Sequence, residues 1–189
     1  MYHTTRFAGA FTVLLGFAAS SFVANGAVAI RPGKTSTMQL TSTAFQEGAP
    51  IPAQYTCAGR NISPPLQWSG MPAGVKSLAL IADDPDAPAG VWVHWVVYNL
   101  PPSAAGLAED TPKSQDLANG AKQGLNDFKR PGYGGPCPPP GKPHRYFFKL
   151  YALDAMLDLK PGATKKGVEA AMSNHILAQT QLMGTFQRK

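Results

Sequence analysis

The stretch Asp83–Pro102, DDPDAPAGVWVHWVVYNLPP, contains the strongest strand signal of the chain and half of the candidate site. Its second part, Val91–Leu100, is dense in β-branched and aromatic residues, which favours a strand. Pro101-Pro102 ends the strand, because proline cannot donate a ladder hydrogen bond. Two prolines restrict the backbone on either side of Asp86, so the acidic loop before the strand is held stiffly. The segment predicts a rigid loop that leads into one long strand.

A second stretch with the same plan is Gly134–Asp154, GGPCPPPGKPHRYFFKLYALD. A loop rich in glycine and proline leads into a predicted strand at His144–Leu153. Each of the two strands carries one histidine close to an aromatic residue. Two such units can bring their histidines to one small polar pocket, although they lie far apart in the sequence.

The alternation of side chains along a strand predicts which residues face that pocket. Side chains two positions apart share a face. Trp92 and His94 are therefore expected on one face of the first strand, and His144 and Tyr146 on one face of the second. The residues expected on the opposite faces are Val91, Val93, Trp95, Arg145 and Phe147.

Both loops allow two interpretations from the residues alone. The carboxylates of Asp84 and Asp86 can serve a site, or they can form an Asx-type turn with solvated acids. In the loop 133–141, the amides of Gly134 and Gly135 can bind a phosphate or carboxylate oxygen. The alternative for this loop is a rigid connector fixed by Cys137.

The remaining elements predict a mainly β domain. Strands are expected at Met38–Phe45 and Val75–Ala82, and one short helix at Thr164–Met172. His175–Phe186 is either a continuation of this helix or a final strand, and Pro102–Pro136 is expected to be irregular. Many short strands with proline-rich turns and one late α-helix indicate an antiparallel β-sandwich of two sheets.

The N-terminal residues have the pattern of an export signal. Met1–Ala29 combines a weakly basic start with an uncharged apolar stretch and ends in Ala27-Val28-Ala29, which resembles a signal-peptidase site. A membrane anchor is the alternative, but a basic stop-transfer flank is missing. We expect cleavage after Ala29, a flexible leader at 30–37, and one domain at 38–189. The protein would then be exported, either to the periplasm or out of the cell.

Charge and cysteine content narrow the class of protein. The net charge is +6, but the lysines and arginines are dispersed, unlike those of a nucleic-acid-binding protein. No second apolar run is long enough to span a bilayer. Cys57 and Cys137 are the only cysteines. An exported chain favours a disulfide between them, and two thiols alone make a poor zinc site.

Taken together, the motifs resemble a known family. The sequence D-P-D-A-P, followed by a strand with H-W-V-V-x-N-L-P and then by G-x-x-P-x-x-G-x-P-H-R-Y-x-F-x-L-Y-A-L-D, is similar to the two signature regions of the phosphatidylethanolamine-binding protein family. The bacterial, Raf-kinase-inhibitor-like branch is the more similar one. Supporting segments are Tyr55–Cys57, Asn61–Leu66, Trp68–Gly70 and His175–Ala178.

The resemblance implies a β-sandwich with an anion-accepting pocket at one end. It also implies a small anionic ligand, such as a phosphate monoester or a phospholipid headgroup, and a role in modulating a kinase or a protease. In the implied pocket, Asp84 orients a histidine or accepts a ligand amine, His94 and His144 donate to phosphate oxygens, and Tyr146 adds a hydroxyl donor. The implied ligand-binding residues are Asp84, Asp86, Pro88, Trp92, His94, Gly135, Pro139, His144 and Tyr146.

The leading hypothesis is an exported, non-enzymatic binding protein that needs no cofactor. A second hypothesis is a protein inhibitor without a physiological small ligand. A third is a hydrolase or metal enzyme, because two aspartates and two histidines, Asp84, Asp86, His94 and His144, are ligand types that suit zinc or iron. The chain lacks the H-E-x-x-H and G-x-S-x-G motifs that would support this third hypothesis.

The export hypothesis predicts the N-terminus of the mature protein. Intact-mass analysis of periplasmic or secreted material should find a chain that begins at or near Ile30. Recovery of the full-length chain from the membrane fraction alone would instead favour an anchor.

Overall fold

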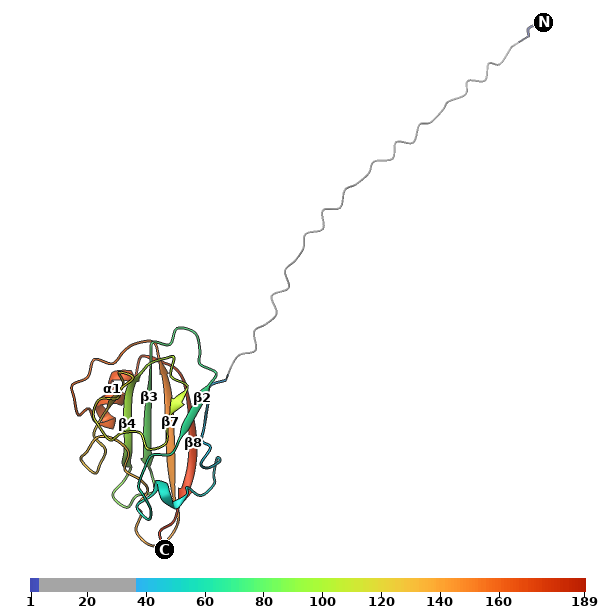
Figure 1. Ribbon diagram of the computed structural model, residues 1–189. Helices are drawn as coiled ribbons and strands as arrows, with labels where there is room; N and C mark the ends of the chain where they lie inside the picture. Colours follow the sequence, from blue (N-terminus) through green and yellow to red (C-terminus); the bar gives the residue numbers. More distant parts are fainter. Residues whose placement is uncertain (4–36) are drawn as a thin grey trace. The chain divides into compact units, whose positions relative to one another are not determined.

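The computed structural model describes residues 1–3 and 37–189. The predicted signal peptide and leader lie almost entirely outside these described residues. From Thr37 onward the chain forms a sandwich of two antiparallel sheets with one α-helix (Figure 1). The elements, in chain order, are β1 (Gln39–Thr41), the 3-10 helix η1 (Ala53–Tyr55), β2 (Leu66–Ser69), β3 (Ser77–Asp84), β4 (Trp92–Leu100), β5 (Gly106–Leu107), β6 (Lys122–Gln123), β7 (His144–Leu153), α1 (Lys165–Met172) and β8 (Ile176–Phe186).

The larger sheet has the strand order β6-β4-β3-β7-β8, and the smaller sheet has the order β1-β2-β5. Strand β3 is buried along its whole length, because it lies between β4 and β7 and is covered on both faces. In these pairings Asp84 lies opposite Trp92, and Asp83 lies opposite Phe147. The end of β3 therefore lies beside the beginnings of β4 and β7. Both signature loops meet at this end of the sheet.

Apolar side chains fill the space between the two sheets. Leu40 and Trp68 of the small sheet pack with Leu80, Trp95 and Phe148 of the large one. Burial of this apolar area is the main term that stabilises such a sandwich. The core packs against one face of the large sheet and does not fill the end of this sheet, where the candidate site lies.

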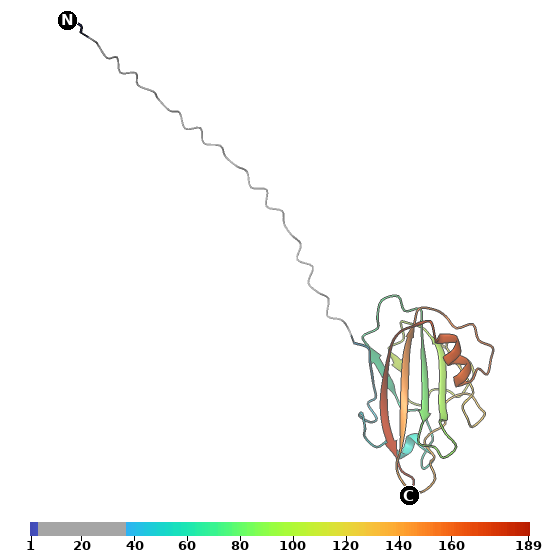
Figure 2. The same ribbon diagram turned by 180° about the vertical axis from the view of Figure 1, so that it is seen from behind.

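Helix α1 covers part of the outer face of the large sheet, next to β4 (Figure 2). Its side chains Val168 and Met172 pack against Ile81 and Val96. The Thr164 side chain caps the helix by accepting a hydrogen bond from the Gly167 amide, as the sequence predicts.

A buried ion cluster also holds this outer layer. The carboxylate of Asp83 is 1% exposed, and it accepts two hydrogen bonds of 2.9 Å from Lys149 Nζ. Lys165 Nζ of α1 lies 3.4 Å from the same carboxylate. A buried charge is tolerated when it is paired in this way. The two adjacent aspartates therefore have different tasks, since Asp83 faces the helix layer and Asp84 faces the candidate pocket.

One prediction about side-chain direction was wrong. Ala82 pairs with Trp95, but Asp83 pairs with Val93, so β4 has one extra residue, His94, at this point. Such a β-bulge reverses the alternation locally. Trp95 consequently packs between the sheets, whereas Val93 packs in the cluster beneath α1. On β7 the predicted alternation holds, with Tyr146 and Phe148 on the inner face.

The structure also resolves the open alternative at the C-terminus. Residues 176–186 form β8, which pairs with β7 along its length, so the segment is a strand and not a helix. The strand β2 and the two-residue strands β5 and β6 were not predicted individually, because they are short. In residues 1–3 and 37–189, no helix is long and apolar enough to cross a membrane.

Candidate functional site

The end of the large sheet holds a pocket of about 200 Å³. Its walls come from the two signature loops, the two strands that follow them, and one residue of the irregular segment. They consist of Asp84, Ala87, Pro88, Trp92, His94, Phe128, Cys137, Pro138, Pro139 and His144.

At the centre of the pocket, Asp84 and His144 form a buried pair. His144 Nδ1 lies 2.8 Å from Asp84 Oδ2, and the two side chains are 13% and 4% exposed. The other carboxylate oxygen, Oδ1, accepts a hydrogen bond of 2.8 Å from the Asp86 amide. The loop is thus an Asx-type turn, as one interpretation had it, but the Asp84 carboxylate is buried and not solvated. Its task is to orient the His144 ring, because an ionised carboxylate only accepts hydrogen bonds.

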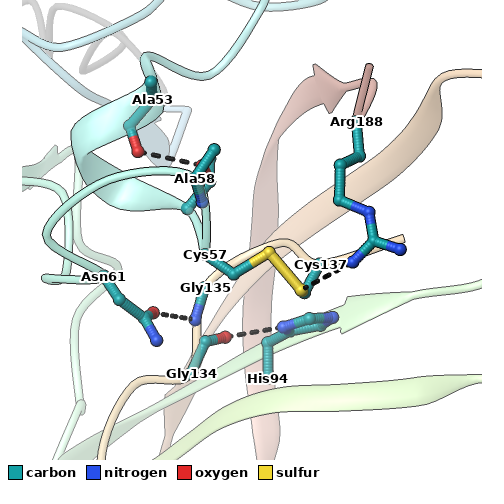
Figure 3. Close-up of a disulfide and its surroundings, with 10 residues drawn as sticks. Ala53, Cys57, Ala58, Asn61, His94, Gly134, Gly135, Cys137 and Arg188 are labelled. Carbon is teal, nitrogen blue, oxygen red and sulfur yellow. Dashed lines mark hydrogen bonds between the residues drawn. A yellow bond between two sulfur atoms is a disulfide. The ribbon is translucent and has the colours of Figure 1, made fainter. Parts of the chain in front are cut away.

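His94 is held from the other side of the pocket. Its Nδ1 donates to the Gly134 carbonyl oxygen over 2.6 Å, an arrangement visible in Figure 3. The His94 ring packs edge-on against Tyr146 and Phe128, with centroid distances of 5.2 Å and 5.7 Å. Burial lowers the pKa of His94, against the opposing effect of the Gly134 carbonyl. His94 is therefore neutral near pH 7, with its proton on Nδ1 and a lone pair on Nε2.

Tyr146 lies beneath the pocket and is not part of its wall. Its side chain is buried, and among the described residues its hydroxyl is the one buried side-chain polar atom without a hydrogen-bond partner. Burial, together with the nearby Asp84 carboxylate, raises the pKa of Tyr146, so the hydroxyl keeps its proton. A buried unpaired hydroxyl is costly and needs an explanation, such as a partner that arrives with a ligand or with water.

Asp86 faces away from the pocket. Its carboxylate accepts hydrogen bonds from the guanidinium of Arg145, at 2.9 Å and 2.7 Å, and from the Arg145 amide at 2.9 Å. Asp86 therefore fixes the acidic loop to β7 and does not line the cavity. The set of Asp84, Asp86, His94 and His144 is not assembled around one point. Within the described ranges, no group of three or more His, Cys, Asp or Glu side chains is placed to hold a metal ion.

The amides of the glycine loop are not free to bind an anion. Gly134 N donates to the His94 carbonyl oxygen at 2.9 Å, and Gly135 N donates to Asn61 Oδ1 at 2.7 Å. A Cβ atom on Gly135 would lie 2.7 Å from Asn61 Oδ1 and 2.9 Å from Thr56 Cα. The glycine is required for this close contact, so the interpretation of the loop as a rigid connector is correct. The expectation that Gly135 binds a ligand through its amide was wrong.

Comparison with known proteins agrees with this architecture. The profile of the phosphatidylethanolamine-binding protein family matches residues 41–187. The chain belongs to the phosphatidylethanolamine-binding protein family.

Sequence relatives and solved structures support this membership. UPF0098 proteins of Methanothermobacter thermautotrophicus and Aquifex aeolicus are 54% and 51% identical to the chain. Each alignment covers 80% of this chain, with 99% of the first relative and 89% of the second. The crystal structure of a phosphatidylethanolamine-binding protein homologue from Chlamydia trachomatis is 46% identical, with a TM-score of 0.75 over 82% of this chain and 99% of that one. Escherichia coli YbcL, described as a member of the mammalian family, is 35% identical, with a TM-score of 0.75 over 80% and 99% of the two chains.

The structure brings six of the nine predicted residues together as pocket walls. They are Asp84, Pro88, Trp92, His94, Pro139 and His144. Sequence reasoning missed Ala87, Cys137, Pro138 and, most importantly, Phe128. The Phe128 ring contacts both Trp92 and His94 edge-on.

Phe128 reaches the pocket because Asp127 attaches the irregular segment to β4. Asp127 Oδ2 accepts a hydrogen bond of 2.8 Å from the Val93 amide, and Asp127 N donates to the Val93 carbonyl oxygen at 3.0 Å. This double contact places Phe128 beside the His94 bulge. The only signal in the sequence was an aromatic residue within a polar segment that also contains Tyr133, which does not specify a position in space.

The contact between Arg145 and Asp86 should have a measurable effect on the acid titration of the Asp86 carboxyl group. The hydrogen bonds from Arg145 lower the pKa of Asp86 from 3.8 to about 2. In Arg145→Met we expect this pKa, followed by carbon-detected NMR, to return toward 3.8. Because a lowered carboxyl pKa stabilises the fold only while the group is ionised, the stability advantage over Arg145→Met should shrink as pH falls from about 4 to about 2. Arg130→Met is the control, and an equal change in both variants would contradict the assignment.

Proposed function

We propose that this protein is a non-enzymatic binding protein whose pocket takes one small anionic group. The favoured group is a phosphate monoester, and the headgroup of a phospholipid, which is a phosphodiester in the intact lipid, is the weaker candidate. A volume of about 200 Å³ suits a group of a few heavy atoms and is too small for a whole lipid. The proposal also places the protein outside the cytoplasm, and the bonded pair Cys57–Cys137 supports this part.

The observation that carries the proposal is the Asp84–His144 pair. Nδ1 of His144 donates to the carboxylate, so the remaining ring nitrogen, Nε2, is the one left for the pocket. When the ring is protonated, Nε2 donates a charge-assisted hydrogen bond to an anion, and Asp84 stabilises the imidazolium. Two cations add to the attraction, since Arg130 lies over the Phe128 ring and Arg188 lies 3.8 Å from Cys137 Sγ.

His94 adds a requirement on the ligand. Its neutral ring presents the Nε2 lone pair, so it can accept a hydrogen bond but cannot donate one. A ligand that accepts from His144 and also donates to His94 fits both nitrogens. The monoanion of a phosphate monoester has this combination of P–O⁻ and P–OH groups, whereas a phosphodiester lacks the proton.

The composition of the walls favours binding over catalysis. In the part of the chain that the structure describes, the pocket wall contains no serine, threonine, lysine or free thiol that could act as a nucleophile. Asp84 is bonded to His144 and to the Asp86 amide, so it is not available to activate a water molecule directly. Aromatic and proline side chains form most of the remaining surface, which suits a site that holds a ligand without changing it.

Substitution of His144 tests the pocket. His144→Ala should weaken binding of methyl phosphate by about 1.5–3 kcal/mol, the range for a hydrogen bond that involves a charged group. The matched control is His175→Ala, because His175 forms the same kind of pair, Nδ1 to Asp154 Oδ1 at 2.7 Å, away from the pocket. Titration calorimetry should show a loss for the first variant only. Equal losses, or no binding by the wild type at millimolar ligand, would refute the proposal.

The proton requirement of His94 predicts a ligand preference and its pH dependence. Methyl phosphate should bind more tightly than dimethyl phosphate at pH 6, and its affinity should fall as pH rises toward 8. The second phosphate pKa is near 6, so the P–OH group that donates to His94 is lost over this range. A higher affinity for the diester, or release of inorganic phosphate from the monoester, would contradict a binding site of this kind.

A further inference from the structure

The disulfide of this protein lies in the wall of the pocket. We propose that the Cys57–Cys137 bond is a redox-sensitive clamp, opened by thiol–disulfide exchange in which an external dithiol attacks Cys57 and Cys137 leaves. The consequence for ligand binding rests on the proposed function. The exchange reaction itself does not.

The disulfide lies at the point in the pocket wall where the main-chain hydrogen bonds of the loop stop. Before Cys137, the loop is tied by Tyr133 Oη to the Tyr55 carbonyl oxygen at 2.8 Å and by Cys57 N to the Pro136 carbonyl oxygen at 3.0 Å. After it come three prolines, 138–140, which have no N–H group to donate. Within the described residues, no main-chain hydrogen bond involves residues 137–140. The next tie is Gln187 Nε2 to the Gly141 carbonyl oxygen, at 2.6 Å.

The wall beyond this point therefore depends on the bond between the two cysteines. Cys137, Pro138 and Pro139 all line the cavity. Figure 3 shows the disulfide joining the loop after η1 to the segment that also holds His94 through Gly134. The Cα atoms of the two cysteines lie 5.3 Å apart, and 80 residues separate them in sequence. Loss of the bond would free the proline wall while leaving the hydrogen bonds of Tyr133–Pro136 in place.

The surroundings of the two sulfur atoms favour attack by an external thiolate on one of them. Both cysteines are exposed, so an external thiolate can reach them. Arg188 Nη1 lies 3.8 Å from Cys137 Sγ. A neighbouring cation lowers the pKa of a thiol, and a thiol with a lower pKa is the better leaving group. Attack is therefore favoured on Cys57 Sγ, with Cys137 released as a thiolate beside Arg188.

A dithiol supplies the two electrons that reduction of the protein disulfide requires. One thiolate of the dithiol forms a bond to Cys57 Sγ, the bond between the two protein sulfurs breaks, and its electron pair goes to Cys137. The second thiol of the reductant then attacks the mixed disulfide and releases Cys57, which takes up a proton. Two electrons pass to the protein, and the dithiol becomes a disulfide.

The direction of attack is tested without any pocket ligand. The oxidised protein is treated briefly with glutathione, quenched in acid, alkylated and mapped by peptide mass spectrometry. We expect glutathione on Cys57 and the alkyl label on Cys137. Because exchange is slower when the leaving thiol is more basic, Arg188→Gln should slow the reaction, on the order of threefold. Lys189→Gln, at the adjacent charge, should react like the wild type. Glutathione mainly on Cys137, or an unchanged rate in Arg188→Gln, would overturn the assignment.

The clamp is tested by comparing the oxidised and reduced proteins well below the melting temperature. Reduction should speed amide hydrogen exchange at Gly141, Lys142 and His144 while leaving β3 protected, with an unchanged circular dichroism spectrum. It should weaken methyl phosphate binding about tenfold, because a mobile wall loses preorganisation, and reoxidation should restore affinity. If the oxidised protein binds nothing, the proposed function fails, and the exchange pattern alone decides whether the clamp exists. Equal exchange in both states, or global unfolding on reduction, would overturn the clamp.

Discussion

A buried carboxylate at the end of the central strand organises the functional end of this protein. Asp84 is the last residue of β3, and burial there would be costly for an unpaired charge. His144 and the Asp86 amide each take one of its oxygens. These two hydrogen bonds join β3, the acidic loop and the first residue of β7. The position of the pocket and the orientation of His144 both follow from the need to satisfy this one side chain.

The two halves of the pocket are made rigid by different means. On the strand side, main-chain ladders, the Asp84 pair and the Asp86–Arg145 contact hold the walls. On the loop side, prolines replace most of the hydrogen-bonding residues, so the chain must be fixed by restricted dihedral angles and by the disulfide. This second half consequently depends on the redox state of two cysteines, whereas the first does not.

The protonation states of the histidines give the pocket its chemical character. His94 is buried against aromatic rings and donates through Nδ1 to a carbonyl oxygen, which leaves an acceptor for the ligand. His144 donates through Nδ1 to a carboxylate, and in the proposed complex its protonated ring donates to the ligand through Nε2. Two residues of the same type thus offer opposite hydrogen-bonding roles. The unpaired Tyr146 hydroxyl beneath them is a further donor that a ligand or a water molecule could reach.

Residue patterns alone predict the long strands β3, β4 and β7, the inner face of β7, the late helix and the pairing of the cysteines. These features follow from the period of two along a strand, the rigidity of proline and the even count of thiols, whereas the family was predicted from the resemblance of the two signature regions. The folded structure was needed to show that His94 lies in a bulge, that the amides of Gly134 and Gly135 are occupied, that Asp86 faces Arg145, and that Phe128 closes the pocket. The physical reason is that each of these depends on a partner distant in sequence. Strand register and competition among nearby donors and acceptors determine which partner a polar group binds. The residues that flank the polar group encode neither of these.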